Sequence, residues 1–162
     1  MSKVRPCLWF DREAEEAAQF YTSIFPNSRI TSVSRYGDAG PRPAGLVMVV
    51  AFELDGQPFT ALNGGPVFKF NEAISFQVNC ATQEEIDYYW EKLSAGGDPK
   101  AQQCGWLKDR YGVSWQVVPT GMEEVLNDPD PERGRRAMEA MLKMRKLDIA
   151  ELRRAADGVP AA

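Results

Sequence analysis

The chain has 162 residues, of which 44% are hydrophobic, and carries a formal net charge of −4 at pH 7 with a sequence pI near 5.0. This acidic balance excludes the basic surface that nucleic acids and anionic membranes attract, so it favours small-molecule or protein partners. No apolar run approaches the roughly 20 residues of a membrane span, and the N-terminus lacks the apolar core of a signal peptide, which predicts a cytoplasmic protein.

Histidine is absent from the sequence, and this limits the chemistry available to the protein. Histidine is the commonest side-chain metal ligand and the usual general base near neutral pH. The three cysteines, Cys7, Cys80 and Cys104, are far apart and lack the spacing of a zinc site. We expect them to be reduced thiols that pack as small apolar side chains.

The first half of the chain predicts the order strand, helix, strand, strand, strand. An apolar segment at residues 4–10 is followed by helical spacing of apolar residues over 12–25, which Pro26 ends. A loop rich in glycine and proline and the turn Asp55-Gly56 separate the remaining strands. We expect these strands at residues 28–36, 46–54 and 57–63.

The second half repeats this order. Residues 73–80 alternate as a strand does, and a helix over 82–97 has Thr82 as its N-cap and Glu85 at the capping-box position. A short segment at residues 99–102 would supply the weak second strand of this half. The hairpin CGWLKDRYGVSWQVVP, residues 104–119, would supply the last two strands.

The two predicted helices also match residue by residue, with an offset of 69 that places Glu15 on Glu84 and Tyr21 on Trp90. Two unrelated amphipathic helices would show part of this similarity, but the matching strand order favours an internal duplication. We expect a first module at residues 1–66, a second at 67–120 and a C-terminal helical extension at 121–162, within one structural domain.

The extension is helical in character. Asp148 and Glu151 form a capping pair, and an apolar stripe follows helical spacing at Ala137, Met138, Met141 and Leu142. We expect this stripe to pack on its own domain or on a second subunit.

Period-two alternation assigns polar side chains to one face of the second module. Ile74, Phe76 and Val78 oppose Ser75 and Gln77 in one strand. In the hairpin, Ser114 and Gln116 oppose Trp115 and Val117, while Trp106 and Lys108 oppose Leu107. If the sheet curls, the polar positions would line a cup; on an open sheet they would simply face water.

These segments together resemble the vicinal oxygen chelate (glyoxalase/bleomycin-resistance/dioxygenase) superfamily, and within it the PhnB-like branch labelled 3-demethylubiquinone-9 3-methyltransferase domain. The resemblance rests on CLWFD…AEEAAQFYTSIFPNS, LNGGPVFKFNEAISFQVNC, EIDYYWEKLSAGG, the hairpin and AMLKMRKLDIAELRRA of the extension. It implies an α+β fold in which duplicated βαβββ modules form a curled mixed sheet, and it implies a homodimer.

Members of the superfamily usually hold a divalent metal with side chains from the first and fourth strands of each module. The corresponding places here fall at Arg5, Thr60, Ala73 and Gln116. Alanine has no donor atom, arginine is a cation, and an amide with a hydroxyl supplies no negative charge. We therefore expect no metal and no other cofactor in this cup.

Three functions remain open at this point. The first is a metal-independent protein or enzyme that binds a small molecule of unknown identity through Trp9, Ser75, Gln77, Trp106 and Gln116. The second is a metal-dependent lyase, isomerase or dioxygenase, which the missing ligands disfavour. The third is a structural or regulatory dimer without a ligand. The methyltransferase label is kept as an alternative, although the chain lacks a glycine-rich loop that leads from a strand into a helix.

Overall fold

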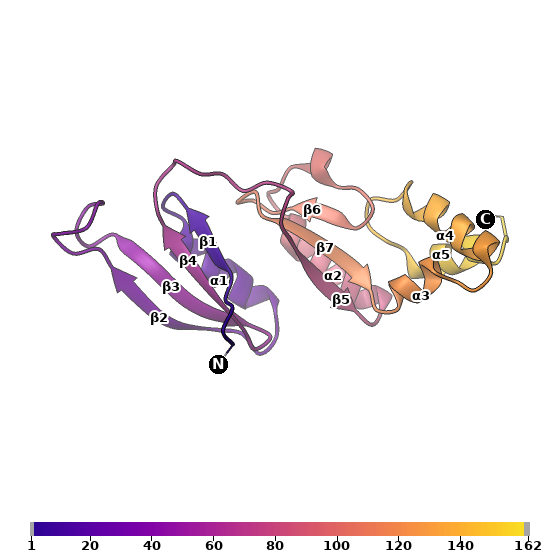
Figure 1. Ribbon diagram of the computed structural model, residues 1–162, viewed down its shortest axis with the longest axis horizontal. Helices are drawn as coiled ribbons and strands as arrows, with labels where there is room; N and C mark the ends of the chain where they lie inside the picture. Colours follow the sequence, from indigo (N-terminus) through magenta and orange to yellow (C-terminus); the bar gives the residue numbers. More distant parts are fainter. Residues whose placement is uncertain (1, 161–162) are drawn as a thin grey trace. The chain divides into compact units, whose positions relative to one another are not determined.

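A computed structural model describes residues 2–160 and divides the chain into two compact units, the first ending at Phe70 and the second beginning at Asn71. No helix within residues 2–160 is long and apolar enough to cross a membrane. Figure 1 shows the first unit in indigo to magenta and the second in pink to yellow. Each unit is described by itself.

The first unit has the predicted order of one helix and four strands. They are β1 (Cys7–Phe10), α1 (Ala14–Ile24), β2 (Arg29–Arg35), β3 (Val47–Leu54) and β4 (Gln57–Asn63). The sheet order is β1-β4-β3-β2, with β1 parallel to β4 and the other pairs antiparallel (Figure 1). Asp55 and Gly56 join β3 to β4 with φ values of 49° and 80°, the left-handed geometry that a two-residue hairpin turn requires.

Helix α1 covers one face of this sheet. Its small residues Ala14, Ala17 and Ala18 are buried, and small side chains let a helix approach a sheet closely. Tyr21 stacks on Phe52 of β3 with ring centroids 6.4 Å apart, and Phe52 stacks on Phe59 of β4 at 5.4 Å. These aromatic contacts form the core of the first unit.

Asn63 joins the helix to the sheet at the end of β4. Its side chain is 1% exposed; Oδ1 accepts a hydrogen bond from the Ala14 backbone N–H at 2.9 Å, and Nδ2 donates to the Val47 carbonyl at 2.9 Å. Tyr36 donates its hydroxyl to the Asn63 carbonyl at 2.7 Å. One buried amide therefore satisfies backbone groups at the start of both α1 and β3.

The second unit repeats the topology with one strand fewer. Its elements are β5 (Ser75–Cys80), α2 (Gln83–Ser94), the 3-10 helix η1 (Pro99–Ala101), β6 (Trp106–Lys108) and β7 (Ser114–Pro119). The sheet order is β5-β7-β6, with β5 parallel to β7 and β6 antiparallel to it. In both units, then, the first strand pairs in parallel with the last, which confirms the duplication.

Two strand predictions for the second unit are wrong. Residues 99–102 do not form the expected strand, because Pro99 lacks an N–H and the Asp98 side chain caps the turn by accepting from the Lys100 N–H. Strand β5 begins at Ser75, so Ile74 precedes the sheet and is 73% exposed. Phe76 and Val78 keep the predicted inward face.

The strands form two small mixed sheets, one in each unit, and neither sheet is curled (Figure 1). The α+β class and the duplicated modules are as predicted, but the curl is not. The second sheet has three strands, of which β6 has three residues, and so short a sheet accumulates little twist or bend.

Helix α2 packs on the second sheet as α1 packs on the first. Its buried residues Ile86 and Leu93 lie 69 positions after the buried Ala17 and Ile24, the offset found in the sequence. Thr82 accepts from the Glu85 N–H, and the Glu85 carboxylate accepts from the Ala81 N–H, which confirms the predicted capping pair.

The C-terminal extension forms three helices within the second unit, α3 (Met122–Leu126), α4 (Pro131–Met141) and α5 (Ile149–Ala156), which gather at one end of it in Figure 1. Asp148 caps α5 as predicted, accepting from the Glu151 N–H at 2.9 Å. The predicted apolar stripe is buried at Ala137, but Met138 and Leu142 are exposed.

A connecting segment, residues 144–149, ties this extension to the module, and we call it the strap. The carbonyls of Met144 and Arg145 accept from the N–H groups of Cys104 and Gly105, each at 2.8 Å. The Gln83 side chain donates to the Leu147 carbonyl at 3.0 Å and accepts from the Ile149 N–H at 2.9 Å. Leu147 itself is fully buried.

We predict that Asn63→Ala lowers the free energy of unfolding by about 2–4 kcal/mol, because it leaves buried backbone groups of Ala14 and Val47 without partners. Urea denaturation measures this loss. Asn79→Ala removes an exposed amide from β5 and is the matched control, with an expected change within about 0.5 kcal/mol. Equal effects of the two substitutions would contradict the structural role of Asn63.

Candidate functional site

The face of the second sheet that lies away from α2 carries two rows of polar side chains. Strand register places Ser75 opposite Ser114, and Ser114 opposite Lys108. The next row contains Gln77, Gln116 and Trp106 in the same order of strands. Residues of the other parity, including Val78, Leu107, Trp115 and Val117, are buried. We call this two-row surface the open face.

A chain of hydrogen bonds crosses the open face. Gln77 donates Nε2 to Oε1 of Gln116 at 3.5 Å, and Gln116 donates Nε2 to the Ser75 hydroxyl oxygen at 2.9 Å. The second contact is the stronger one, because 3.5 Å is at the limit of hydrogen-bond geometry. Ser75 accepts through its oxygen, so its hydroxyl hydrogen stays available for a ligand.

Ser114 brings a buried hydroxyl to the same face. Its side chain is 2% exposed, and Oγ has no hydrogen-bond partner among the described residues. A buried hydroxyl without a partner costs about 1–3 kcal/mol. This face of the second sheet therefore contains a buried hydroxyl whose hydrogen-bonding capacity is unused among the described residues.

Charge lies at one end of the open face. Lys108 forms an ion pair with Glu72, which lies just before β5. The hydrogen bond from Lys108, with a smaller coulombic contribution from the same residue, holds the pKa of the Glu72 carboxyl below its usual range. Glu72 is thus ionised at neutral pH, and its carboxylate is the partner of Lys108.

The β6–β7 turn is held by a buried carboxylate on the opposite side. Asp109, which is 2% exposed, accepts from the backbone N–H groups of Tyr111 at 2.8 Å and Val113 at 3.1 Å. Its second oxygen accepts from Nε1 of Trp115 at 2.9 Å. Gly112 completes the turn with φ 87°. Asp109 therefore caps this turn.

Four of the five predicted ligand residues thus lie together: Ser75, Gln77, Trp106 and Gln116. The fifth, Trp9, belongs to β1 of the first unit. Its indole donates to the Gly65 carbonyl at 2.9 Å and packs edge-on against Phe68 at 4.8 Å between ring centroids. Its part in a ligand site stays a prediction.

Two features of the site have no local sequence signal. The alternation placed Ser114 on the polar face, but its burial depends on tertiary packing. Glu72 precedes the strand, and its pairing with Lys108, 36 positions later, follows only from the parallel and antiparallel pairing of β5, β7 and β6.

The residues at the expected metal positions are poor metal ligands, and they are divided between the two units. Thr60 lies opposite Cys7 and Gln116 opposite Gln77, while Ala73 precedes β5 and is exposed. Within residues 2–160 no three or more His, Cys, Asp or Glu side chains come together as metal ligands. The open face offers amide and hydroxyl oxygens without a carboxylate of its own, which is a poor donor set for a divalent transition metal.

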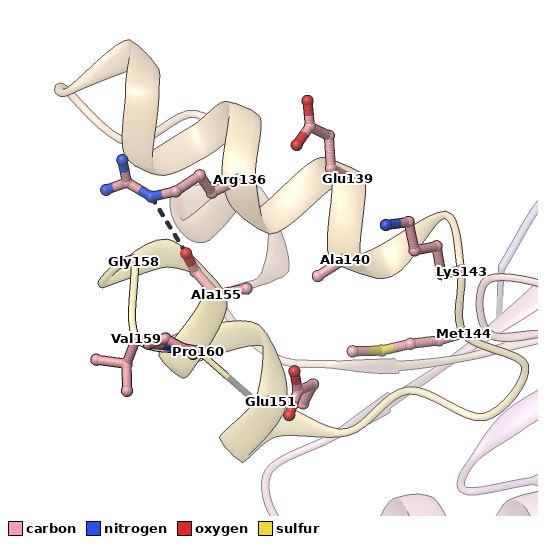
Figure 2. Close-up of a pocket in the computed structure, with 10 residues that line it drawn as sticks. All are labelled: Arg136, Glu139, Ala140, Lys143, Met144, Glu151, Ala155, Gly158, Val159 and Pro160. Atoms are coloured by element: carbon pink, nitrogen blue, oxygen red, sulfur yellow. Dashed lines mark hydrogen bonds between the residues drawn. The ribbon is translucent and has the colours of Figure 1, made fainter. Parts of the chain in front are cut away.

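A hollow of about 470 Å³ lies between α4 and α5 (Figure 2). Its charged groups have partners within the extension. Arg136 donates to the carbonyls of Ala155 and Ala156, while Glu139 pairs with Arg135 and Glu151 with Arg154. The Arg136 contacts join the two helices, and the other two pairs lie within single helices. Since these charged groups already have partners, the hollow is a weaker candidate than the open face.

The family model described as 3-demethylubiquinone-9 3-methyltransferase matches residues 2–118. The chain belongs to this family. The match ends before the C-terminal extension, so the extension segment included in the resemblance lies outside the matched residues. None of the curated proteins matches the chain.

Solved structures agree with this family. The PhnB protein from Bacillus cereus, described as a putative 3-demethylubiquinone-9 3-methyltransferase, is 40% identical with a TM-score of 0.65, covering 74% of this chain and 100% of its own. Protein PA1353 from Pseudomonas aeruginosa has 21% identity and a TM-score of 0.57, covering 74% and 98%. The fosfomycin resistance protein FosX from Listeria monocytogenes, complexed with Mn(II) and sulfate, has 18% identity and a TM-score of 0.53, covering 78% and 98%.

The last two proteins show the fold alone. The family match and the PhnB protein, at 40% identity, confirm the PhnB-like branch of the vicinal oxygen chelate superfamily for this chain. The Mn(II) of FosX belongs to that protein. Membership of the family establishes the fold of this chain, whereas the class of ligand depends on the residues of the open face.

We predict that Asp109→Asn lowers the free energy of unfolding by about 2 kcal/mol or more, because one carboxylate oxygen is replaced by an N–H donor within a cluster of donors. Thermal unfolding followed by tryptophan fluorescence measures the change. Asp55→Asn is the matched control in an exposed turn, where asparagine tolerates φ 49°. Near-neutral stability of the Asp109 variant would contradict its structural role.

Proposed function

We propose that the protein binds a small molecule on the open face without a metal ion. The observation that carries this proposal is the chain of hydrogen bonds from Gln77 through Gln116 to Ser75, beside Trp106. Small-molecule sites combine an apolar or aromatic wall with a few oriented polar groups. The open face offers both within one unit of the chain.

The amides support a recognition role because their geometry is set before a ligand arrives. Gln116 directs Nε2 toward Ser75 and Oε1 toward Gln77, so the donor and acceptor positions of its amide are defined. A site with fixed donors and acceptors loses less conformational entropy on binding than one made of free side chains.

Methyl transfer, named in the family description, is not part of this proposal. The common AdoMet-binding fold has alternating parallel β–α units and a glycine-rich loop between a strand and a helix. Each described sheet of this chain has a single parallel pair of strands, β1–β4 and β5–β7. Nothing in the described residues favours methyl transfer over simple binding.

We also propose a cytoplasmic homodimer. Three large apolar side chains are exposed close together in the sequence, Val67 (73%), Phe68 (61%) and Ile74 (73%). Exposed apolar groups of this kind are typical of surfaces that a partner covers. The three free cysteines fit a reducing compartment.

The amide row gives the first prediction. Gln77→Leu combined with Gln116→Leu should abolish binding of any planar small molecule that wild-type protein retains through purification, with a change in thermal midpoint of about 2 °C or less. Native mass spectrometry and thermal unfolding measure the two quantities. Gln57→Leu, an exposed amide of the first unit, is the control. A large loss of stability would mean that the amides of the open face are structural.

The exposed apolar residues give the second prediction. Light scattering should report twice the chain mass of 18.1 kDa for the wild type. Ile74→Asp should shift the protein toward the monomer, because a buried unpaired charge opposes association. Gln57→Asp, which places the same charge at an exposed polar residue, should leave the mass unchanged. A monomeric wild type at micromolar concentration would contradict the dimer.

A further inference from the structure

The open face has an aromatic end and a cationic end on one short strand. Trp106 and Lys108 lie two residues apart on β6, so their side chains leave the same face about 7 Å from each other. Gln116 lies opposite the tryptophan, and Ser114 lies opposite the lysine. The surface therefore offers an aromatic ring at one end and a lysine at the other, separated by about the length of a small aromatic molecule.

The cationic end already binds a carboxylate, which is that of Glu72. This side chain is 65% exposed and belongs to the segment before β5, whereas Lys108 is 26% exposed and fixed on its strand. Exposed ion pairs contribute little to stability, so an external anion could replace Glu72 at small cost. The Glu72–Lys108 pair shows which kind of group the lysine accepts.

Ser114 supplies a second donor at this end. Its buried hydroxyl lacks a partner among the described residues, and it shares a face and a register position with Lys108. Because the Ser114 hydroxyl is closed off from solvent in the structure, an anionic oxygen at Lys108 would reach it only after the side chains that cover it have moved. Hydrogen bonds from a cation and a hydroxyl to an anion are stronger than those between neutral groups.

From these contacts we propose that the open face binds a planar molecule that bears an anionic oxygen group such as a carboxylate. Its ring lies on Trp106, and its anion replaces Glu72 at Lys108 and completes the hydrogen bond of Ser114. Gln77 and Gln116 contact a polar edge of the same molecule. This inference rests on the proposed function and adds the chemical class of the ligand.

Isothermal titration of the full chain with 2-naphthoate and with its neutral counterpart 2-naphthamide tests the class of ligand. The wild type should bind 2-naphthoate about tenfold more tightly, as expected for one charge-assisted contact. Lys108→Met should remove this preference and leave the affinity for 2-naphthamide unchanged. Lys100→Met is the matched control at an exposed position.

Glu72→Gln separates competition from a structural role. If Glu72 occupies the place of the ligand anion, this substitution should strengthen 2-naphthoate binding about threefold, opposite in sign to Lys108→Met. If the ion pair only maintains the shape of the face, both substitutions should weaken binding. Glu91→Gln on the exposed surface of α2 is the control for loss of one negative charge.

Ser114→Ala gives an independent readout. It should weaken 2-naphthoate binding severalfold while the thermal midpoint of the free protein stays equal or rises, because an unpaired buried hydroxyl has been removed. Equal affinities for 2-naphthoate and 2-naphthamide, or no binding of 2-naphthoate at millimolar concentration, would overturn the inference. If the protein binds 2-naphthamide and Gln116→Leu abolishes this binding, the open face is still supported as the ligand site. The proposed function and the proposed ligand class can therefore fail separately.

Discussion

The parallel pairing of the first and last strands of each module determines where side chains meet in this protein. In the second unit, β5 and β7 are separated by a helix, a 3-10 turn and β6, yet they lie side by side. Without this pairing Ser75 and Gln116, 41 positions apart, could not share a hydrogen bond. The short strand β6 then adds Trp106 and Lys108 to the same surface. The covering helix buries one parity of each strand and thereby assigns the other parity to the open face.

The same pairing shows how far the two modules have diverged. In the first unit, Cys7 lies opposite Thr60, whereas in the second Gln77 lies opposite Gln116. These cross-strand pairs therefore differ in chemistry, a thiol with a hydroxyl in one module and two amides in the other. The duplication has kept the strand order and the buried helix positions while the outward residues changed. Such positions do not contribute to the core, so substitutions there cost little stability.

Much of this arrangement could be predicted from the sequence because the signals were periodic. The offset of 69 between the helices, the alternation in β5 and β7 and the Asp55-Gly56 turn each depend on local spacing. The prediction of a strand at residues 99–102 is wrong because a proline and a capping aspartate outweigh the weak strand propensity of this segment. The burial of Ser114 and the pairing of Glu72 with Lys108 could not be predicted from the neighbouring sequence. Both arise from strands brought together across the chain, which no window of sequence contains.

The strap makes the C-terminal extension part of the same folded unit as the second module. The family match stops at residue 118, but Cys104 and Gly105 place their N–H groups on carbonyls of residues 144 and 145. The Gln83 side-chain amide forms hydrogen bonds with both the Leu147 carbonyl and the Ile149 N–H, as a neighbouring strand would. The N–H groups of Cys104 and Gly105, which precede β6, should therefore exchange with solvent only when the strap detaches. The residues that match the family model are fewer than those joined by these hydrogen bonds, and the extension protects the backbone next to Trp106.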